Sequence, residues 1–531
     1  MKYQKFILIV IIILFLFTLS IQAANYGGRL DIKVEQRPIN LNPIYASDST
    51  AQMINQQIFD TLVSYDQNGN LIENLAESWE ISKRGTVFKF KLKEEVHFQP
   101  YKVNNKQISL TERNVEAEDW KWSFEYLASP ANKSPYAELL NKVKGYRDYR
   151  EGKSNEISGI KVLDKYQLEI ELTESYAPFI YNLAEEAAVV LPKKAVSNNE
   201  NNFSTAPTGT GPFKFKNFSD QYITVERNKD YWKNNYQEEK LPYLDEIKIH
   251  FSAAEIGQED YQQYDIYQLQ SKFDEKFQDE DKINKNYRFK NIPDDFYYYL
   301  GINYNNNLKS SQSSEDIKKL LISVLSEDNF SAEKLLESSM FPAGNKESNL
   351  YIEKLQNSIQ DNVEGEIKIE AELPVLEFIN SQSDKSENIA KLIKDKLRDN
   401  KIEVDREDFS WSEYIRALKD DQLKSDLFLM TYQYQNRFEF LKDNFYSDSE
   451  LNFFNYKNSR LDNLVDYLKL ADTKESQEQA YQIIEEILIS DKPLMFLMKK
   501  REPHLISKKL VNQDLFDSPF SKNKFELLYF K

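Results

Sequence analysis

The chain has 531 residues, of which 40% are apolar and 13% aromatic, a composition that suits two or three globular domains and excludes a disordered chain. Its 86 acidic residues outnumber 69 lysines and arginines, which gives a net charge of −17. Because phosphates require a basic surface, this acidity argues against a nucleic acid as partner. The lack of cysteine excludes disulfides, thiol nucleophiles, cysteine-ligated zinc and a lipid-modified cysteine after a leader.

The first residues have the layout of a secretory signal peptide. Two lysines precede an uncharged stretch over residues 6–25, which contains the small residues Ala23 and Ala24 as cleavage positions. We expect residues 1–24 to be removed and the mature protein to be exported and soluble. The alternative is an uncleaved membrane anchor, because the uncharged stretch is long enough to span a bilayer.

Alternating strands and amphipathic helices are expected up to residue 251. Alternating apolar residues predict strands, and apolar residues spaced three or four apart predict helices. The expected strands cover 28–34, 86–92, two within 160–172, a pair within 213–225, and 247–251. The expected helices cover 52–62 and 117–127, and a hairpin is centred on the Asn-Gly pair at 68–69. The spacing of acidic residues around that turn does not match a calcium loop.

A strand, a helix and a second strand follow one another after residue 360. Residues 366–373 alternate as a strand, residues 388–400 carry an apolar helical stripe, and a further strand opens at 402–404. A βαβ unit of this length implies a parallel sheet. A last amphipathic helix is expected over 475–490.

No catalytic constellation emerges from the sequence. The histidines, His97, His250 and His504, are far apart along the chain, and no His-x-x-x-His or His-Glu-x-x-His pair offers a zinc site. Acidic residues are so frequent that paired carboxylates carry no information. We therefore expect no enzyme activity, no cofactor and no metal.

The stretch Thr205 to Phe215 places Gly209 and Gly211 around one threonine. A phosphate cradle would need these glycines to lead into a helix N-terminus. Here Pro212 and an alternating strand follow, so we interpret the stretch as a turn before a strand.

The same stretch resembles a known family. The motif Pro-Thr-Gly-Thr-Gly-Pro-Phe at 207–213, followed by Arg-Asn at 227–228 and Tyr-Trp at 231–232, is similar to the signature of solute-binding protein family 5, the oligopeptide- and dipeptide-binding proteins of ABC importers. Further strings agree in the family's order: Leu41-Asn-Pro43, Phe59-Asp-Thr-Leu62, Leu75-Ala-Glu-Ser-Trp-Glu80, Ala117-Glu-Asp119, Lys142-Val-Lys-Gly-Tyr146, Leu300-Gly-Ile-Asn303 and Asp462-Asn-Leu464 after Arg460. The resemblance covers nearly the whole mature chain.

The resemblance implies a mixed α/β fold of the two-lobed periplasmic-binding-protein type II, with a three-domain layout, a hinge and a ligand cleft between the lobes. Lobe one would combine residues 25–58, 206–298 and 497–531. Residues 59–205 would form an inserted domain, and residues 299–496 would form lobe two.

The resemblance also implies the site residues. Trp411 and Tyr432 stand where family members place aromatic side chains against the ligand, and Tyr45, Ser47 and Asp48 align with a ligand-facing loop of the opposite lobe. Gln435 stands where the family has an aspartate that holds the α-ammonium of a peptide. A neutral amide suits a hydroxyl, an amide or a blocked amine better than an ammonium, although Asp48 could supply the missing charge.

The function implied is the extracytoplasmic binding component of an ABC importer, a monomer that captures an oligopeptide or dipeptide and delivers it to a membrane permease and its ATPase. A neutral oligosaccharide is the alternative ligand. A secreted hydrolase or a sensor on the same scaffold is the alternative function.

Overall fold

In the computed structural model, the described residues are 25–303, 321 and 375–531, apart from gaps at 68, 104–105, 199, 234–238, 252–259, 270–284, 383, 420–424, 434–435, 492 and 519–520. The expected leader, the strand expected at 366–373 and Gln435 lie outside them. Among the helices of the described part, none combines the length and apolar character needed to cross a bilayer.

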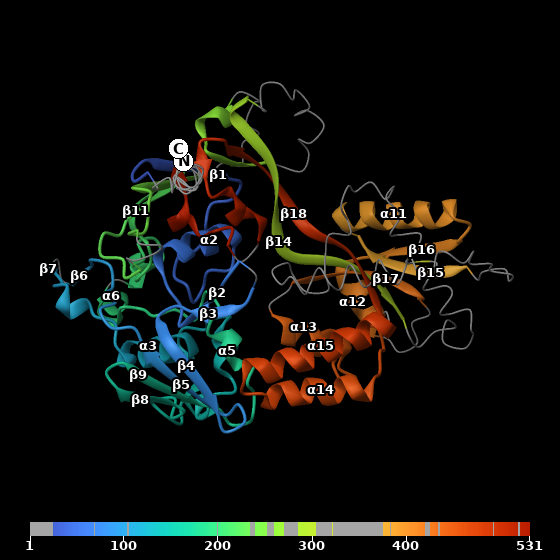
Figure 1. Cartoon of the computed structure of the whole chain (residues 1–531), viewed down its shortest axis with the longest axis horizontal. Coiled ribbons are helices and arrows are strands. Elements are labelled where there is room, and N and C mark those ends of the chain that lie inside the picture. Colours follow the sequence, from blue (N-terminus) through green and yellow to red (C-terminus); the bar gives the residue numbers. More distant parts are fainter. Residues whose placement is uncertain are drawn as a thin grey trace, which may run out of the picture.

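A ten-stranded sheet runs through the described part of the chain in the order β10-β11-β12-β1-β13-β18-β14-β17-β15-β16. Its strands are β1 Arg29–Val34, β10 Phe213–Phe218, β11 Tyr222–Arg227, β12 Glu246–Phe251, β13 Ile266–Gln268, β14 Tyr287–Ile302, β15 Leu376–Ser381, β16 Val404–Phe409, β17 Leu427–Gln433 and β18 Leu494–Ser507. We call β10, β11, β12, β1 and β13 the first half-sheet, and β17, β15 and β16 the second half-sheet. The two long strands β14 and β18 connect them (Figure 1).

A smaller four-stranded antiparallel sheet lies below the first half-sheet in the view of Figure 1 and has the order β4-β5-β9-β8. Its strands are β4 Ala76–Ser82, β5 Val87–Leu92, β8 Ile160–Asp164 and β9 Gln167–Glu171. Buried and exposed residues alternate along β5 from Phe88 to Leu92, as the sequence predicts for a strand with one wet face. Two-stranded ribbons complete the described strands: β2 Val63–Tyr65 with β3 Leu71–Glu73, β6 Lys102–Val103 with β7 Lys106–Gln107, and β19 Leu510–Val511 with β20 Tyr529–Phe530.

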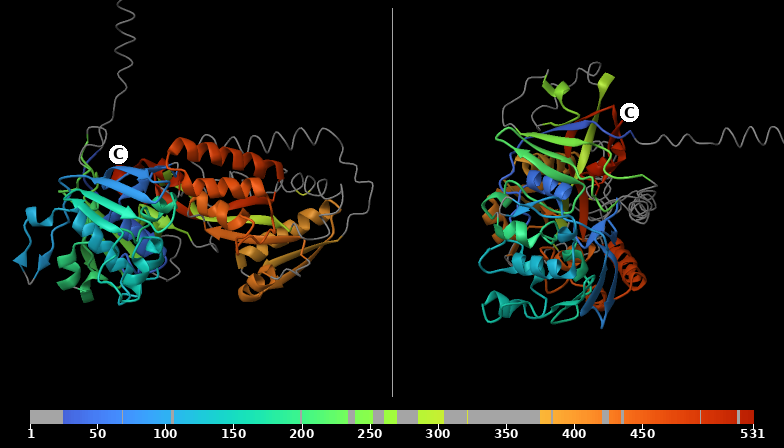
Figure 2. Two further views of the ribbon diagram at one scale, coloured as in Figure 1. Left: turned by 90° about the horizontal axis from the view of Figure 1, so that it is seen from below. Right: turned by 90° about the vertical axis from the view of Figure 1, so that its left-hand side faces the viewer.

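Helices cover these sheets (Figure 2). They are α2 Ser49–Ile58, α3 Ala117–Ala128, α4 Tyr146–Arg150, α5 Phe179–Asn182, α6 Lys193–Asn198, α7 Glu200–Phe203, α11 Asp384–Asp399, α12 Trp411–Lys419, α13 Arg437–Phe445, α14 Ser459–Leu470 and α15 Lys474–Asp491. Short 3-10 turns lie at Thr111–Arg113, Ala137–Leu140, Asp260–Gln263, Gln513–Asp517 and Phe525–Leu527.

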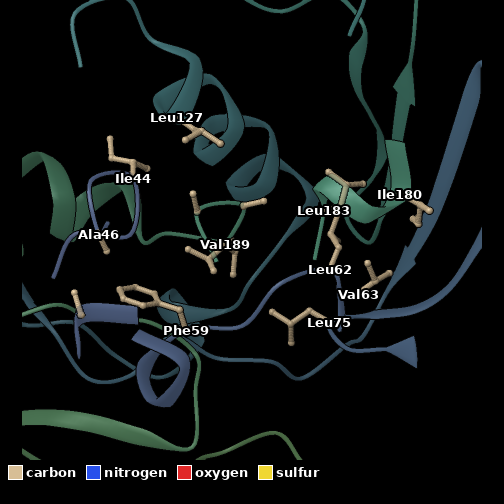
Figure 3. Close-up of a cluster of buried hydrophobic side chains, with 14 of the residues drawn as sticks. Ile44, Ala46, Phe59, Leu62, Val63, Leu75, Leu127, Ile180, Leu183 and Val189 are labelled. Atoms are coloured by element: carbon tan, nitrogen blue, oxygen red, sulfur yellow. The ribbon is translucent and has the colours of Figure 1, made fainter. Parts of the chain in front are cut away.

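Most expected elements are present, with one clear correction. The helix expected over 52–62 is α2, which begins at Ser49 and ends at Ile58, so the prediction is wrong for the last four residues. Phe59 has an extended backbone and caps the helix end. Leu62 is buried although it is not helical, because it packs into the same core as α2 (Figure 3). Its apolar side chain therefore continued the helical spacing in the sequence.

A βαβ unit is present and consists of β15, α11 and β16, whereas the first strand expected for it, at 366–373, lies outside the described residues. Strand β15 pairs in parallel with β16, and α11 connects them. Strand β15 also pairs in parallel with β17, so the three strands of the second half-sheet share one direction.

The second half-sheet has a hydrophobic core on each face. One core joins Leu300, Phe378 and Leu429 to Ile393 and Leu397 of α11. The other face carries Tyr299, Phe428 and Met430, and these side chains belong to a larger core with α12, α13 and α15. That larger core continues into the four-stranded sheet and the residues around α2, which Figure 3 shows as a cluster including Ile44, Phe59, Leu62, Leu127 and Val189.

Candidate functional site

The loop that follows β1 carries three of the candidate residues, Tyr45, Ser47 and Asp48, which we call the loop group. Because β1 pairs in parallel with β12 and β13, this loop leaves the carboxyl edge of the parallel strands of the first half-sheet. Ligands of open α/β sheets bind outside such carboxyl edges. The loop group therefore has the position that a ligand-facing loop requires.

Hydrogen bonds tie much of the loop group into the fold. Asp48 caps the start of α2, because its Oδ1 accepts from the N–H of Ala51 at 2.8 Å. Its Oδ2 accepts from the N–H of Ile39 at 3.1 Å, which closes the loop. The hydroxyl of Tyr45 donates to the carbonyl of Asn132 at 2.8 Å. Ser47 is exposed, so its hydroxyl is open to solvent.

Trp411 and Tyr432 form the strand-edge group, whereas the third candidate of this lobe, Gln435, lies outside the described residues. Trp411 is the first residue of α12 and follows the carboxyl end of β16, while Tyr432 lies at the carboxyl end of β17. Since β15, β16 and β17 are parallel, Trp411 and Tyr432 lie at the same edge of the second half-sheet. The sequence names both residues but does not show this shared edge.

Trp411 combines exposure with a fixed support. Its side chain is 55% exposed, and its ring lies against that of Tyr414 with centroids 6.2 Å apart. Tyr414 is fully buried, and its hydroxyl donates to the carbonyl of Leu429 in β17 at 2.6 Å. An exposed indole on a rigid base is suited to stack on a ligand, because little side-chain freedom is then lost on binding.

Tyr432 has a polar partner of its own. Its hydroxyl donates to Oδ2 of Asp443 at 3.2 Å, and its ring packs edge-on against Phe440. Burial raises the pKa of the Tyr432 phenol far above its usual value, and the carboxylates of Asp443 and Glu439 add to this shift. Burial likewise raises the pKa of Asp443. This places a carboxyl group of α13 next to the strand-edge group.

The Gly-Thr-Gly stretch is a structural junction. A Cβ atom at Gly209 would lie 2.2 Å from the carbonyl oxygen of Ile58, and one at Gly211 would lie 2.6 Å from that of Gln57. Only glycine fits where two backbones approach this closely. The expected turn before a strand is confirmed, since β10 starts at Phe213.

A buried polar network surrounds this junction. Asp60 Oδ2 accepts from the Thr210 hydroxyl at 2.8 Å and from the Trp232 indole N–H at 3.0 Å. The amide of Gln99 donates to the carbonyl of Phe213 at 2.6 Å, and its oxygen accepts from the N–H of Gly209. Burial raises the pKa of Asp60, although the bonds from Trp232 and Thr210 oppose the shift. These motif residues thus hold three chain segments together.

The histidines lie in separate places. His250 Nε2 is 2.9 Å from Asp31 Oδ1, and His504 Nδ1 is 2.8 Å from the carbonyl of Glu502. His97 lies on an isolated bridge with Asn114. Within the ranges described above, no group of three or more His, Asp or Glu side chains is arranged to hold a metal ion.

Comparisons with known proteins agree with this architecture. Residues 70–313 match the model of bacterial extracellular solute-binding proteins, family 5 middle region. The oligopeptide-binding protein OppA of Bacillus subtilis is 24% identical over 271 residues, 46% of this chain and 47% of OppA. The dipeptide-binding protein of Escherichia coli is 26% identical over 38% of this chain and 40% of its own length. The matched region thus spans less than half of these curated relatives.

Solved structures match over nearly the whole chain. The unliganded open form of the periplasmic murein tripeptide binding protein MppA has a TM-score of 0.74 at 17% identity, covering 96% of this chain and 99% of MppA. AppA of Bacillus subtilis in complex with a nonapeptide has a TM-score of 0.56 at 19% identity, covering 96% of this chain and all of AppA. The fold is therefore that of the periplasmic binding proteins of this type, mixed α/β with several sheets, as the sequence predicts.

Motif order, the match of residues 70–313 to the family model and the shared fold all point the same way: the chain is similar to solute-binding protein family 5.

Proposed function

We propose that this protein is the extracytoplasmic binding component of an ABC importer, which captures an oligopeptide or dipeptide between its two halves and delivers it to a membrane permease and its ATPase. The observation that carries this proposal is the placement of the two candidate groups. The loop group and the strand-edge group both follow the carboxyl ends of parallel strands, one in each half-sheet. Relatives named for binding oligopeptides and dipeptides support the choice of ligand.

The domain boundaries belong to the same proposal. Residues 1–24 would be the signal peptide, or an uncleaved anchor, and would direct a monomer to the periplasm or cell exterior. Residues 25–58, 206–298 and 497–531 would form lobe one, with 59–205 inserted and 299–496 as lobe two. Both proposed lobe boundaries fall within the long strands β14 and β18, which supports their role as the hinge.

The relative placement of the halves supports an open, ligand-accepting state. The TM-score is 0.74 with the unliganded open form of MppA, against 0.56 with AppA bound to a nonapeptide and 0.59 with DppA of Helicobacter pylori bound to a peptide. All three relatives share the fold at a similar, low sequence identity, so domain placement is the natural source of the difference.

The chemistry of the ligand depends on Gln435. A peptide α-ammonium in a closed site needs a carboxylate, because an unpaired buried charge costs several kcal/mol. Both oxygens of Asp48 accept backbone N–H bonds away from the strand-edge group, whereas Asp443 lies within reach of that group, with Oδ2 bonded to Tyr432 and Oδ1 3.6 Å from the ammonium of Lys442. Asp443 is therefore the carboxyl group best placed to replace the missing aspartate, and a neutral oligosaccharide is the ligand expected if it does not.

Native mass spectrometry of the exported protein, purified without denaturant, tests the function directly. We expect the mature chain with a co-purified peptide, and recovery of an oligosaccharide would select the alternative ligand. Turnover of peptides or glycosides in the same preparation would contradict a binding protein and indicate a hydrolase.

Calorimetry with the identified peptide, free and N-acetylated, tests the role of Gln435. A charge-assisted hydrogen bond contributes about 1.5–3 kcal/mol, roughly ten- to a hundredfold in affinity. If no carboxylate holds the ammonium, wild type binds both forms equally and Gln435→Asp prefers the free amine. If wild type already prefers the free amine, Gln435 has no part in this contact, and Asp443→Asn should then remove the preference.

A further inference from the structure

A second contact joins the two parts of the molecule, away from β14 and β18. The segment before α5 meets α13 and the end of α14, and this contact lies below the long strands in the view of Figure 1. The hydroxyl of Tyr176 donates to the carboxylate of Glu439 in α13. The N–H of Ala177 donates to the carbonyl of Lys469 in α14 at 2.8 Å.

This contact is closely packed and nearly dry. Tyr176 is 7% exposed, and both Ala177 and Phe438 are fully buried. The rings of Tyr176 and Phe438 meet edge to face, with centroids 5.5 Å apart. The ammonium of Lys142 lies over the ring of Tyr176, 4.7 Å from its centroid.

The turn between β4 and β5 packs against both sides of the contact, at Ala177 and Lys469. A Cβ atom at Gly85 would lie 2.7 Å from the nitrogen of Ala177 and 2.9 Å from the carbonyl oxygen of Lys469. The carbonyl of Gly85 also accepts from the N–H of Tyr176 at 3.0 Å. Gly85 has φ +79°, so both its backbone conformation and its surroundings require glycine. Three chain segments therefore meet here at van der Waals distance.

The long strands provide the other connection. The end of β18 pairs with β13 of the first half-sheet, and the end of β14 pairs with β17 of the second. Between these ends, the register of β14 against β18 shifts between Pro293 and Tyr297. An interruption of ladder pairing makes a strand pair easier to bend at that point. The connection is thus continuous along the chain but deformable in the middle.

We propose that the contact of Tyr176 and Ala177 with α13 and α14 is a second pivot, and that the two halves rotate about an axis through this contact and the register shift of β14 and β18. Two bodies joined at two separate points keep only the rotation about the line between them. Atoms near an axis move little, so the packed rings of Tyr176 and Phe438 and the backbone hydrogen bond from Ala177 to Lys469 can persist through the motion. The inference rests on the proposed function in so far as a ligand drives the rotation.

The opposite possibility is a latch that must open before the halves can close. A disulfide distinguishes the two, and the chain has no cysteine of its own to interfere. Ala177→Cys with Lys469→Cys joins two backbones already within hydrogen-bonding distance, a span that a disulfide can bridge. The matched control is Lys89→Cys with Glu169→Cys, a cross-strand pair within the four-stranded sheet.

Pulsed electron paramagnetic resonance reads out the motion, with spin labels carried on p-acetylphenylalanine at the exposed positions Leu163 and Leu392. The probe is a tryptic digest of casein. For a pivot, the digest shifts the distance between the labels equally in the oxidised and the reduced Ala177–Lys469 variant. A shift that appears only after reduction, with the control pair unaffected, overturns the proposal and makes the contact a latch.

The same distance measurement on ligand-free protein does not depend on the proposed function. Tyr176→Phe keeps the ring and removes only the bond to Glu439, and Tyr176→Ala removes the packing as well. We expect the distance distribution to widen slightly for the first and clearly for the second, because rotations about other axes become possible. An unchanged width in a folded Tyr176→Ala protein overturns the pivot even if the digest binds. If the digest shifts nothing in any variant while the width changes as expected, the proposed function fails and the pivot stands.

Discussion

The loop group and the strand-edge group occupy equivalent edges of the two half-sheets but differ in how far their largest side chain is exposed. Asp48 and Tyr45 of the loop group have their oxygens bonded to backbone groups of their own half. Trp411 of the strand-edge group is 55% exposed on a buried tyrosine. From this difference we predict that the first half supplies a fixed wall, whereas the second half supplies the contacts that select the ligand.

The largest effect is expected beneath the loop group, at the end of α2. Gly209→Ala places a methyl group where 2.2 Å separates it from the carbonyl oxygen of Ile58. We expect a loss of about 3 kcal/mol in the free energy of unfolding, because backbone must move to make room. Urea denaturation measures it. Gly152→Ala is the control, because Gly152 has a φ of +71° but a Cβ atom there would have no neighbour within 4 Å. We expect this control to lower the free energy of unfolding by about 1 kcal/mol. Equal losses would contradict the close-contact explanation.

A pH-dependent effect is expected at Asp119, which closes the capping box of α3 in the same half. Burial raises its pKa from 3.8 to about 6. The folded protein then holds a proton more tightly than the unfolded chain, so stability falls as the pH rises from about 4 to about 6. Asp119→Asn lacks this loss. Above pH 7 the Asp119→Asn variant should be more stable than wild type by about 2 kcal/mol, a figure reduced because Asp119 keeps some solvent contact. Below pH 4 the two proteins should be equally stable, because Asp119 is then protonated in both the folded and the unfolded state.

Urea midpoints from pH 3.5 to 8 measure this difference, with Glu118→Gln as the control. Glu118 is the exposed neighbour in the same helical turn, so its substitution removes one charge without changing a buried group. A difference between wild type and Asp119→Asn that does not vary with pH would contradict the assignment.

The strand-edge group should behave in the opposite way. Trp411→Ala is expected to leave the free energy of unfolding within about 0.5 kcal/mol, because the side chain is largely exposed. Affinity for the ligand recovered by native mass spectrometry should fall about tenfold, which corresponds to an aromatic contact that contributes about 1.4 kcal/mol to binding. Tyr467→Ala, which removes another half-exposed aromatic ring from α14, is the matched control. Equal affinities for both variants would remove Trp411 from the site.

The sequence predicted the fold well where local pattern and family motifs coincide. The strands β5 and β12 and the helix α3 follow from periodicity alone, because each buries one regular face. The end of α2 was missed because Leu62 is buried without being helical. Periodicity reports burial, and burial here comes from tertiary packing as well as from the helix.

The candidate site was predictable only in part. Motif alignment named the residues of both groups, yet it could not show that Asp48 is a helix cap or that Tyr432 is bonded to Asp443. Both bonds join residues through the geometry of a particular backbone, which a single sequence does not report. The assignment of both groups to a ligand stays a prediction.

The smallest effect concerns Asp48 and tests whether the loop group is structural. Asparagine is as good a helix cap as aspartate, whereas alanine is a poor one. Asp48→Ala should therefore lower the free energy of unfolding by about 1 kcal/mol, and Asp48→Asn by no more than a few tenths. If Asp48 only caps α2, the affinity for a peptide with a free N-terminus stays the same in Asp48→Asn. A charge contact with the ligand predicts the reverse, an unchanged stability with affinity reduced ten- to a hundredfold for that peptide and unchanged for its acetylated form. That outcome would make the two groups alike and end the distinction between a fixed wall and a selecting one.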